Sequence, residues 1–304
     1  NVINMSGMFS SCNNLVSLDL SNFDTSKVIS FSNMFKDCIS LNIININDLQ
    51  TIEAKDISYM FSNCKSLTSI DISNFVTNKV INISGLFQGC ESITNLELSN
   101  FKTNEIIDMS HLFQDCSKLI SLDLSSFDTS KVKNMSYMFN YCSNLEKVDT
   151  SRFITSNVQD MSFMFSFCRM IDSFEIANFD TKNVENMAGM FKFCPSMSSL
   201  SIGNFDTSKV KNMSQFFEDC AALTSLDVSK FNITQVQDMS NMFEDCTSLS
   251  SLDVSNFDTS NVEDMSEMFA GLSKVSLLDV SKFDLGKVTN TSKMLSFAEQ
   301  IHLC

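Results

Sequence analysis

One period of 26 residues runs through the chain, and it limits the possible folds more than any other feature. Ten of the eleven cysteines recur at this spacing, from Cys12 to Cys246, and a phenylalanine stands three residues before each of them. Two further columns hold 17 of the 19 methionines. Self-similarity of this length is typical of solenoids, in which each unit contacts only its neighbours. We therefore predict a single solenoid domain over residues 1–304, with about 11 units and a first unit that starts in mid-repeat.

The first half of each unit has the apolar spacing of a short helix. Met135, Met138, Phe139 and Cys142 recur as i, i+3, i+4 and i+7, which is one face of a helix. The position before the first of these apolar residues, Asn134 in this unit, is Asn, Asp or Ser in every unit. Such side chains accept hydrogen bonds from the free amides of a first helical turn. A short helix is therefore predicted in each unit.

The second half of each unit alternates as a short strand does. The pattern Leu-x-x-Leu-x-Leu, as at Leu119, Leu122 and Leu124, places alternate side chains on one face. Each strand should pair in parallel with its equivalent one coil away, at about 4.8 Å. Phe127 then turns inward, and the Asp-Thr-Ser segment at 128–130 bends the chain back. The predicted fold class is an α/β repeat solenoid with a parallel sheet on one face and short helices on the other.

Two segments of the repeat resemble a known family. They are Asn134-Met135-Ser136-Tyr137-Met138-Phe139 followed by Cys142, and Leu122-Asp123-Leu124-Ser125-Ser126-Phe127-Asp128-Thr129-Ser130-Lys131-Val132. Both are similar to the BspA-type leucine-rich repeat, in the form found in mycoplasma lipoproteins and other bacterial surface proteins. The resemblance covers essentially the whole chain; the unit at 43–55 and the stretch after Lys293 depart from the pattern.

The resemblance implies a right-handed leucine-rich-repeat coil that a bacterium displays on its surface or secretes. It also implies roles in adhesion or host contact. The family has no accepted enzymatic activity and no single ligand, so the resemblance assigns no functional residue.

Composition excludes several classes of function. A formal charge of −15 argues against nucleic acid as a partner, because nucleic-acid binding needs a basic surface. No apolar run approaches the length of a membrane-spanning helix. With two histidines and no glycine-rich phosphate loop, the chain is predicted not to be an enzyme and to need no cofactor. Because the first unit is cut in mid-repeat, a missing leader says nothing about location.

The cysteine column has three interpretations: zinc ligands, disulfides or buried thiols. Zinc sites need clustered ligands, whereas each cysteine here stands alone in its unit. Neighbouring thiols are one coil apart, but their Cβ vectors point the same way, which disfavours disulfides. We predict buried free thiols that act as small core residues. Cys304 lies outside the column and is predicted to be the most reactive thiol.

An acidic column lies between the last two apolar residues of each strand and should face away from the core. Its central members are Asp71, Glu97, Asp123, Asp149 and Glu175. Carboxylates spaced by about 5 Å repel one another, which should raise some of their pKa values or gather cations. Two interpretations stay open: a solvated face with serine–aspartate hydrogen bonds, or a ribbon that binds divalent cations weakly or binds polyols.

Aromatic residues interrupt a polar pattern in the sixth to eighth units. The positions after the serine and before the cysteine of the predicted helix, normally polar or glycine, become Tyr137, Tyr141, Phe163, Phe167 and Phe193, with Arg169 and Met170 just beyond. Stacked coils should gather them into one exposed patch, and such patches mark contact surfaces. The patch is predicted to be a protein or homodimer interface; the alternative is packing on a flanking segment or on itself.

These observations leave three hypotheses for function. The leading one is a surface protein that binds a host or matrix protein or a glycan through the aromatic patch or the acidic sheet face. The second is a structural spacer, or an element of a self-associating surface layer, without a discrete ligand. The third is a cation-dependent ribbon that uses the acidic column. A column of threonines from Thr25 to Thr259 adds ice binding as a minor alternative.

Overall fold

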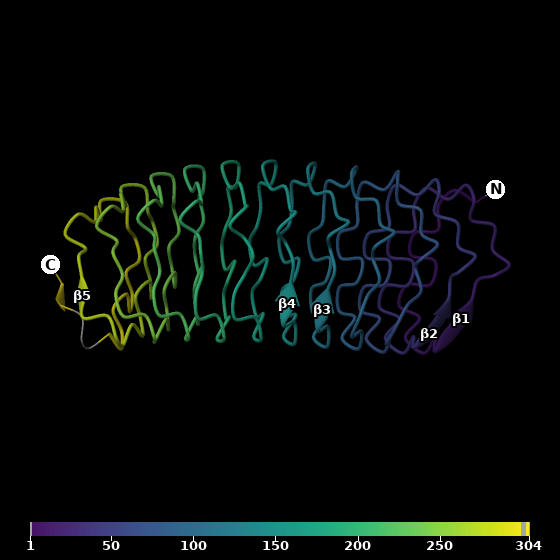
Figure 1. The fold of residues 1–304 in the computed structure, drawn as a ribbon, viewed down its shortest axis with the longest axis horizontal. Helices are drawn as coiled ribbons and strands as arrows, with labels where there is room; N and C mark the ends of the chain where they lie inside the picture. Colours follow the sequence, from purple (N-terminus) through teal and green to yellow (C-terminus); the bar gives the residue numbers. More distant parts are fainter. Residues whose placement is uncertain (1, 299–301, 304) are drawn as a thin grey trace. The chain divides into compact units, whose positions relative to one another are not determined.

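The computed structural model describes residues 2–298 and the backbone of residues 302–303. The chain divides into two compact units, Asn1–Ile154 and Thr155–Cys304, and each is described by itself. From here on, "unit" means one of these two parts, and each 26-residue repeat is called a coil. Within each unit the chain winds in successive coils (Figure 1). Equivalent residues of neighbouring coils form parallel bridges, as Asn4 does with Ser30. The predicted repeat solenoid is therefore confirmed in both units.

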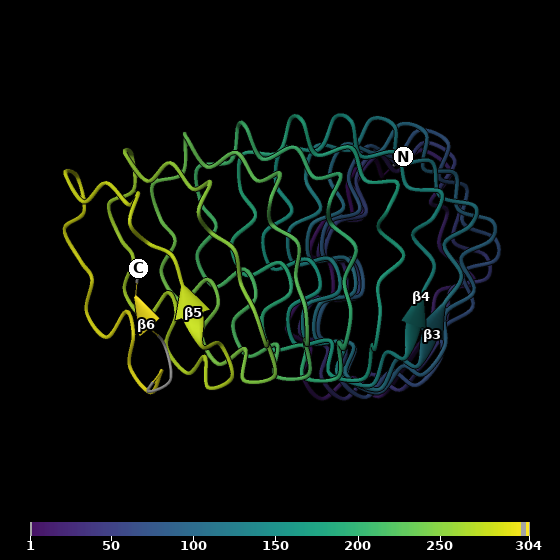
Figure 2. The same ribbon diagram turned by 60° about the vertical axis from the view of Figure 1, so that its left-hand side comes forward.

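Six short strands occur in the described part of the chain. They are β1 (Ser17–Asp19), β2 (Ile43–Asn45), β3 (Ser121–Leu122), β4 (Lys147–Val148), β5 (Leu277–Leu278) and β6 (His302–Leu303). They form three parallel pairs, β1 with β2, β3 with β4 and β5 with β6. In the second pair, which lies side by side in Figure 2, Leu122 faces Val148, and both side chains are buried. The predicted parallel pairing is confirmed for these three pairs, whereas the other coils of the described residues have no strand at the equivalent positions.

The predicted helices are wrong, because the described residues contain no helix. The segment that opens each coil forms successive tight turns instead. The Met138 amide donates to the Met135 carbonyl at 3.3 Å, and the Cys142 amide donates to the Phe139 carbonyl at 3.0 Å. Asn134 does accept from the Ser136 amide through Oδ1 at 3.0 Å, as a helix cap would, but the bond opens a turn.

The remaining amides of this segment join one coil to the next. In the preceding coil the His111 amide donates to the Ser136 carbonyl, and the Phe113 amide donates to the Met138 carbonyl, both at 2.9 Å. Every second amide therefore closes a turn within its own coil, and the amides between them bond to the next coil. A continuous helix would direct every amide along its own chain, so this bonding pattern replaces it.

Two positions of the turn segment adopt left-handed backbone conformation in coil after coil. In the coil discussed above they are Tyr137 and Tyr141, each with φ of 58°. Five of the seven glycines occupy these positions elsewhere, and asparagine or aspartate fills many of the others. These are the residues that tolerate this conformation best. The turns still direct the apolar side chains inward, which explains why their spacing imitated that of a helix.

Stacked phenylalanines form the centre of each unit. Phe113 is fully buried, with its ring centroid 6.2 Å from that of Phe87 and 5.7 Å from that of Phe139. The thiols pack beside them: Cys116 Sγ donates to the Phe87 carbonyl at 3.2 Å. From Cys38 to Cys246 every cysteine of the column is free and buried, as predicted, and Cys304 lies outside the described residues.

We expect the nine buried thiols of the column, from Cys38 to Cys246, to be inert in the folded protein. Burial raises the pKa of Cys194 from 9.0 to about 12, so its thiolate fraction falls by about three orders of magnitude. In a Cys304→Ser background, dithionitrobenzoate should modify the exposed Cys12 rapidly and the nine buried thiols only after denaturant is added. Cys12→Ser should remove the fast phase. Rapid modification of several thiols in the native background protein would contradict this structure.

The threonine column is internal and cannot serve as an ice-binding face. Thr103 is 2% exposed, and its Oγ1 donates to the Asp128 carbonyl at 2.9 Å. The same oxygen accepts from the Asp128 amide at 2.7 Å. Wherever both bonds form, the threonine hydroxyl donates one hydrogen bond to the backbone of the next coil and accepts another from it.

Candidate binding surfaces

The acidic sheet face is built from turn-forming aspartates. Asp71 Oδ1 accepts from the Ser73 amide at 3.0 Å and from the Ser73 hydroxyl at 2.7 Å. Asp123 and Asp149 likewise accept from the amides of the serines two positions later, both at 2.9 Å. The serine–aspartate interpretation is therefore confirmed for these residues. Their carboxylates already close the turn that follows each strand segment.

The expected rise in pKa on this face is wrong for the same three aspartates. Hydrogen bonds from the serine side chain and then from its amide lower the pKa of Asp71, Asp123 and Asp149 below 3.8. Repulsion between Asp123 and Asp149 is present, but it is smaller than these bonds. On this face of the unit formed by residues 1–154, a polar groove is lined by Glu97, Asp123 and the serines around them. Cation binding by this column stays a prediction.

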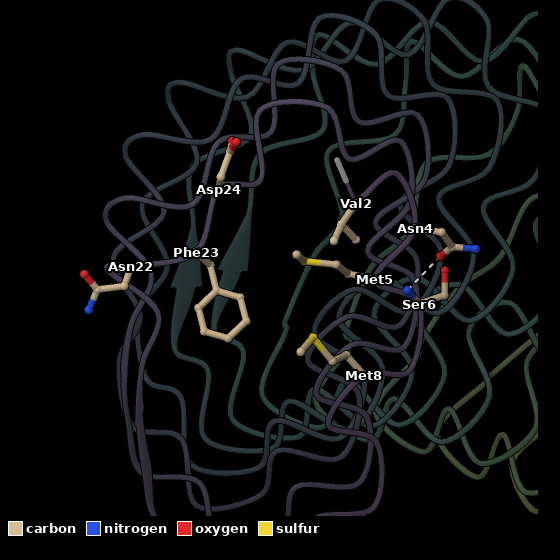
Figure 3. Close-up of a pocket in the computed structure, with 8 residues that line it drawn as sticks. All are labelled: Val2, Asn4, Met5, Ser6, Met8, Asn22, Phe23 and Asp24. Carbon is tan, nitrogen blue, oxygen red and sulfur yellow. Dashed lines mark hydrogen bonds between the residues drawn. The ribbon is translucent and has the colours of Figure 1, made fainter.

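A second hollow opens at the first coil and is lined mainly by core side chains. Figure 3 shows Met5, Met8 and Phe23 directed into it, and the Ser6 amide bonded to Asn4 Oδ1 at 2.8 Å on its rim. The same methionine and phenylalanine columns are buried in later coils. The hollow is therefore a cross-section of the apolar core, suited to packing rather than to acid–base chemistry.

The aromatic residues singled out in the sequence all lie at left-handed positions of the turn segment. Tyr137 and Tyr141 belong to the unit of residues 1–154, and the three phenylalanines belong to the other. In the first unit Tyr137 stacks on His111, with ring centroids 4.9 Å apart. Figure 3 shows that the turn segment lies across the core from the side where the strands run. A patch that joins the two groups stays a prediction.

Within residues 155–304, Phe167 and Phe193 stack on each other beside Arg169, and these two phenylalanines are called the aromatic pair. The rings of Phe167 and Phe193 stack with centroids 4.7 Å apart, and the Arg169 guanidinium lies 4.8 Å from the Phe193 centroid. Both rings are half-buried and Arg169 is exposed. Phe163 lies nearby in the chain with its ring against Gly189, where a Cβ would fall 2.3 Å from the ring.

Carboxylates continue the turn segment beyond the aromatic pair. This carboxylate ridge comprises Glu218, Asp219, Glu244, Asp245 and Glu267. Lys192, next to Phe193 in the chain, pairs with Glu218 at 2.9 Å, and Lys293 pairs with Glu267 at 3.3 Å. The other three carboxylates form no ion pair with the described residues. Burial, and then neighbouring negative charge, raises the pKa of Asp219.

The ridge gives stability an unusual pH dependence. Burial and like charges raise the folded-state pKa of Asp219 above 3.8 and that of Glu244 above 4.5. Their ionisation disfavours folding, so stability should increase as pH falls from about 7 through these raised values. The sheet-face aspartates have lowered pKa values, so their contribution is lost once pH falls below 3.8.

Urea midpoints measured across this range should therefore pass through a maximum on the acid side of neutral pH, above the pH at which the sheet-face aspartates become protonated. Asp219→Asn with Glu244→Gln should raise stability at neutral pH and flatten the neutral side of the profile. The acid side should not change in the variant. A profile that falls steadily from neutral pH in the parent protein would show that the ridge is not electrostatically strained.

Two further observations concern metal binding and membrane spanning. In the part of the chain that the structure describes, no group of three or more His, Cys, Asp or Glu residues could hold a metal ion. The same described residues include no helix that is long and apolar enough to cross a membrane.

Repeated coils with parallel strands on one side and turns on the other define a leucine-rich-repeat solenoid. The solved structure of a leucine-rich repeat protein from Bacteroides ovatus is similar, with a TM-score of 0.51 at 20% identity, over 95% of this chain and 87% of that one. The chain belongs to the repeat family described as Mycoplasma protein of unknown function, DUF285, whose model matches residues 1–96, 82–199, 167–252 and 224–303. The predicted family resemblance is thereby confirmed.

A leucine-rich cell surface protein from Faecalibacterium prausnitzii is also similar, with 16% identity and a TM-score of 0.44, over 99% of this chain and 82% of that one. No curated protein matches the chain. The likeness to the Bacteroides ovatus protein concerns the fold alone.

Proposed function

We propose that this chain is a non-enzymatic binding protein, displayed on a bacterial surface or secreted. It recognises a protein partner through the surface formed by Phe163, Phe167 and Phe193 on its turn segments, here called the aromatic face. Leucine-rich repeats generally mediate protein interactions, which supports the class of function. The observation that carries the proposal is the placement of Phe163, Phe167 and Phe193 at left-handed backbone positions, with φ between 54° and 59°.

The local backbone conformation is unfavourable for these phenylalanines. A bulky residue in left-handed conformation costs about 1–2 kcal/mol, whereas glycine or asparagine adopts it readily. Other coils build the same turns with Gly189, Asn63 or Asn241 at these positions. The coil therefore does not need the aromatic rings. Unfavourable conformations that persist often serve recognition, and half-exposed aromatic rings are common anchors at interfaces.

A selection with phage-displayed random peptides tests the proposal. The parent protein and a Phe163→Asn, Phe167→Asn, Phe193→Asn variant would be immobilised side by side. Because asparagine occupies both columns in other coils, the variant should fold, which circular dichroism would verify. We expect the parent to enrich peptides that the variant does not retain. Equal enrichment by both proteins would place binding elsewhere, and no enrichment by either would favour the structural spacer.

Light scattering of the same two proteins, with and without calcium, separates the remaining alternatives. A parent dimer that becomes monomeric in the variant would make the face a homodimer interface. A calcium-dependent change in both proteins would favour the acidic sheet face as a cation-binding ribbon. A glycan array covers the remaining ligand class, and glycan binding that the variant retains would exclude the aromatic face from recognition.

A further inference from the structure

The aromatic pair and the carboxylate ridge are continuous along the same turn segments. The Phe167 amide donates to the Lys192 carbonyl at 2.7 Å, and the Phe193 amide donates to the Glu218 carbonyl at 2.7 Å. One coil further, the Asp219 amide donates to the Glu244 carbonyl at 2.9 Å. These bonds set neighbouring coils side by side. The carboxylate ridge therefore begins in the coil that follows Phe193, within the same unit.

Charge on this surface is unbalanced. Five carboxylates share two lysines, Lys192 and Lys293, and in the described residues Asp219, Glu244 and Asp245 form no ion pair. Asp219 and Asp245 occupy the same column as Phe193, one and two coils further on. Equivalent residues of neighbouring coils are about 4.8 Å apart, a spacing at which like charges repel. A ligand that brings positive charge would relieve this repulsion.

The rings beside the ridge already accept a cation. Arg169 lies over Phe193 and also over Phe167, at 4.8 Å and 5.8 Å from the ring centroids. Its aliphatic stem and the ring edges offer apolar contact, and Met170 next to it is 52% exposed. The surface therefore combines apolar contact at one end with uncompensated negative charge at the other.

We propose that the aromatic pair and the carboxylate ridge form one docking surface for a basic segment of a protein partner. Apolar side chains of that segment contact Phe167 and Phe193, and its lysine or arginine side chains face Asp219, Glu244 and Asp245. This inference rests on the proposed function and adds the chemistry of the partner to it. The single charge of Arg169 is outweighed by the three unpaired carboxylates.

Short synthetic peptides and matched variants test the inference by fluorescence anisotropy. The probes are an alternating Lys–Phe peptide, its Glu–Phe counterpart and its Lys–Ser counterpart. The ridge variant is Asp219→Asn, Glu244→Gln, Asp245→Asn, and other coils carry Asn63 and Gln114 in these columns. The control variant, Asp253→Asn, Glu263→Gln, Asp279→Asn, removes the same number of charges from other parts of the coil.

We expect the Lys–Phe peptide to bind the parent most tightly. Its affinity should fall about tenfold or more in the ridge variant and in the Phe167→Asn, Phe193→Asn variant, and change little in the control. Raising salt from about 50 mM to about 300 mM should weaken binding to the parent much more than to the ridge variant.

The outcomes separate the inference from the proposed function. Tighter binding of the Glu–Phe peptide, or equal loss in the ridge and control variants, would overturn the basic-segment inference. If both phenylalanine peptides bind alike and lose affinity only in the aromatic variant, the aromatic face binds ligands but the ridge does not select them. If no peptide distinguishes the aromatic variant from the parent, the proposed function fails as well.

Discussion

Replacing Phe113 with alanine is expected to lower the free energy of unfolding of the unit formed by residues 1–154 by about 3–5 kcal/mol. The side chain is fully buried between Phe87 and Phe139, and its ring planes lie within 2° and 17° of theirs. The truncation removes apolar contacts with both neighbouring coils and leaves a cavity that the rigid backbone ladder cannot close. Urea unfolding followed by circular dichroism measures the loss.

A suitable control is Phe297→Ala, because that side chain is 83% exposed. This change should alter stability by less than about 0.5 kcal/mol. Hydrogen exchange should show where the effect lies, since coils contact only their neighbours in a solenoid. Amides near Phe113 should lose protection first. Uniform loss of protection throughout both units, or a cost like that of the control, would contradict the stacked core.

The second large effect is expected from Thr103→Val. Valine keeps the shape of the side chain but removes the oxygen that both donates to the Asp128 carbonyl and accepts from the Asp128 amide. The change leaves two backbone groups without partners, at about 1–3 kcal/mol each when they are buried. We therefore expect a loss of about 2–4 kcal/mol in the free energy of unfolding, measured in urea.

The chain contains a natural counterpart of this substitution. Ile233 occupies the threonine column and is 1% exposed, so its coil already lacks the bridging hydroxyl. Ile233→Thr should therefore stabilise the unit formed by residues 155–304 by about 1 kcal/mol, while Thr94→Val at an exposed site should have almost no effect. If Thr103→Val costs no more than Thr94→Val, the column is not an essential link between coils.

The sequence predicted the parts of the fold that depend on side-chain burial. Its period established which residues are equivalent, and apolar alternation placed Leu122 and Leu124 inward. Parallel pairing followed because equivalent residues are adjacent in a solenoid. The helix prediction failed because two successive turns bury the same positions as one helical face. Glycine, asparagine and aspartate at the positions equivalent to Tyr137 and Tyr141 carried the signal for turns.

The candidate sites were less predictable than the core. The aromatic residues stood out because their columns are polar elsewhere, but the position of Arg169 over the Phe193 ring depends on how the two coils stack. The acidic column seemed electrostatically strained in the sequence, yet Ser73 and its equivalents neutralise that strain through local hydrogen bonds. The strained carboxylates lie in the turn columns instead. Burial, rather than charge density along the sequence, distinguishes Asp219 from Asp71.

The alternating amide bonds of the turn segment have a consequence for how such a chain can evolve. Because one coil joins the next mainly through main-chain groups, a whole coil can be duplicated or deleted by unequal recombination without creating a mismatched junction. Each such event moves surface residues by one coil, about 4.8 Å, relative to those on the other side of it. Spacing between recognition elements can therefore change in fixed steps while the residues within each element stay the same.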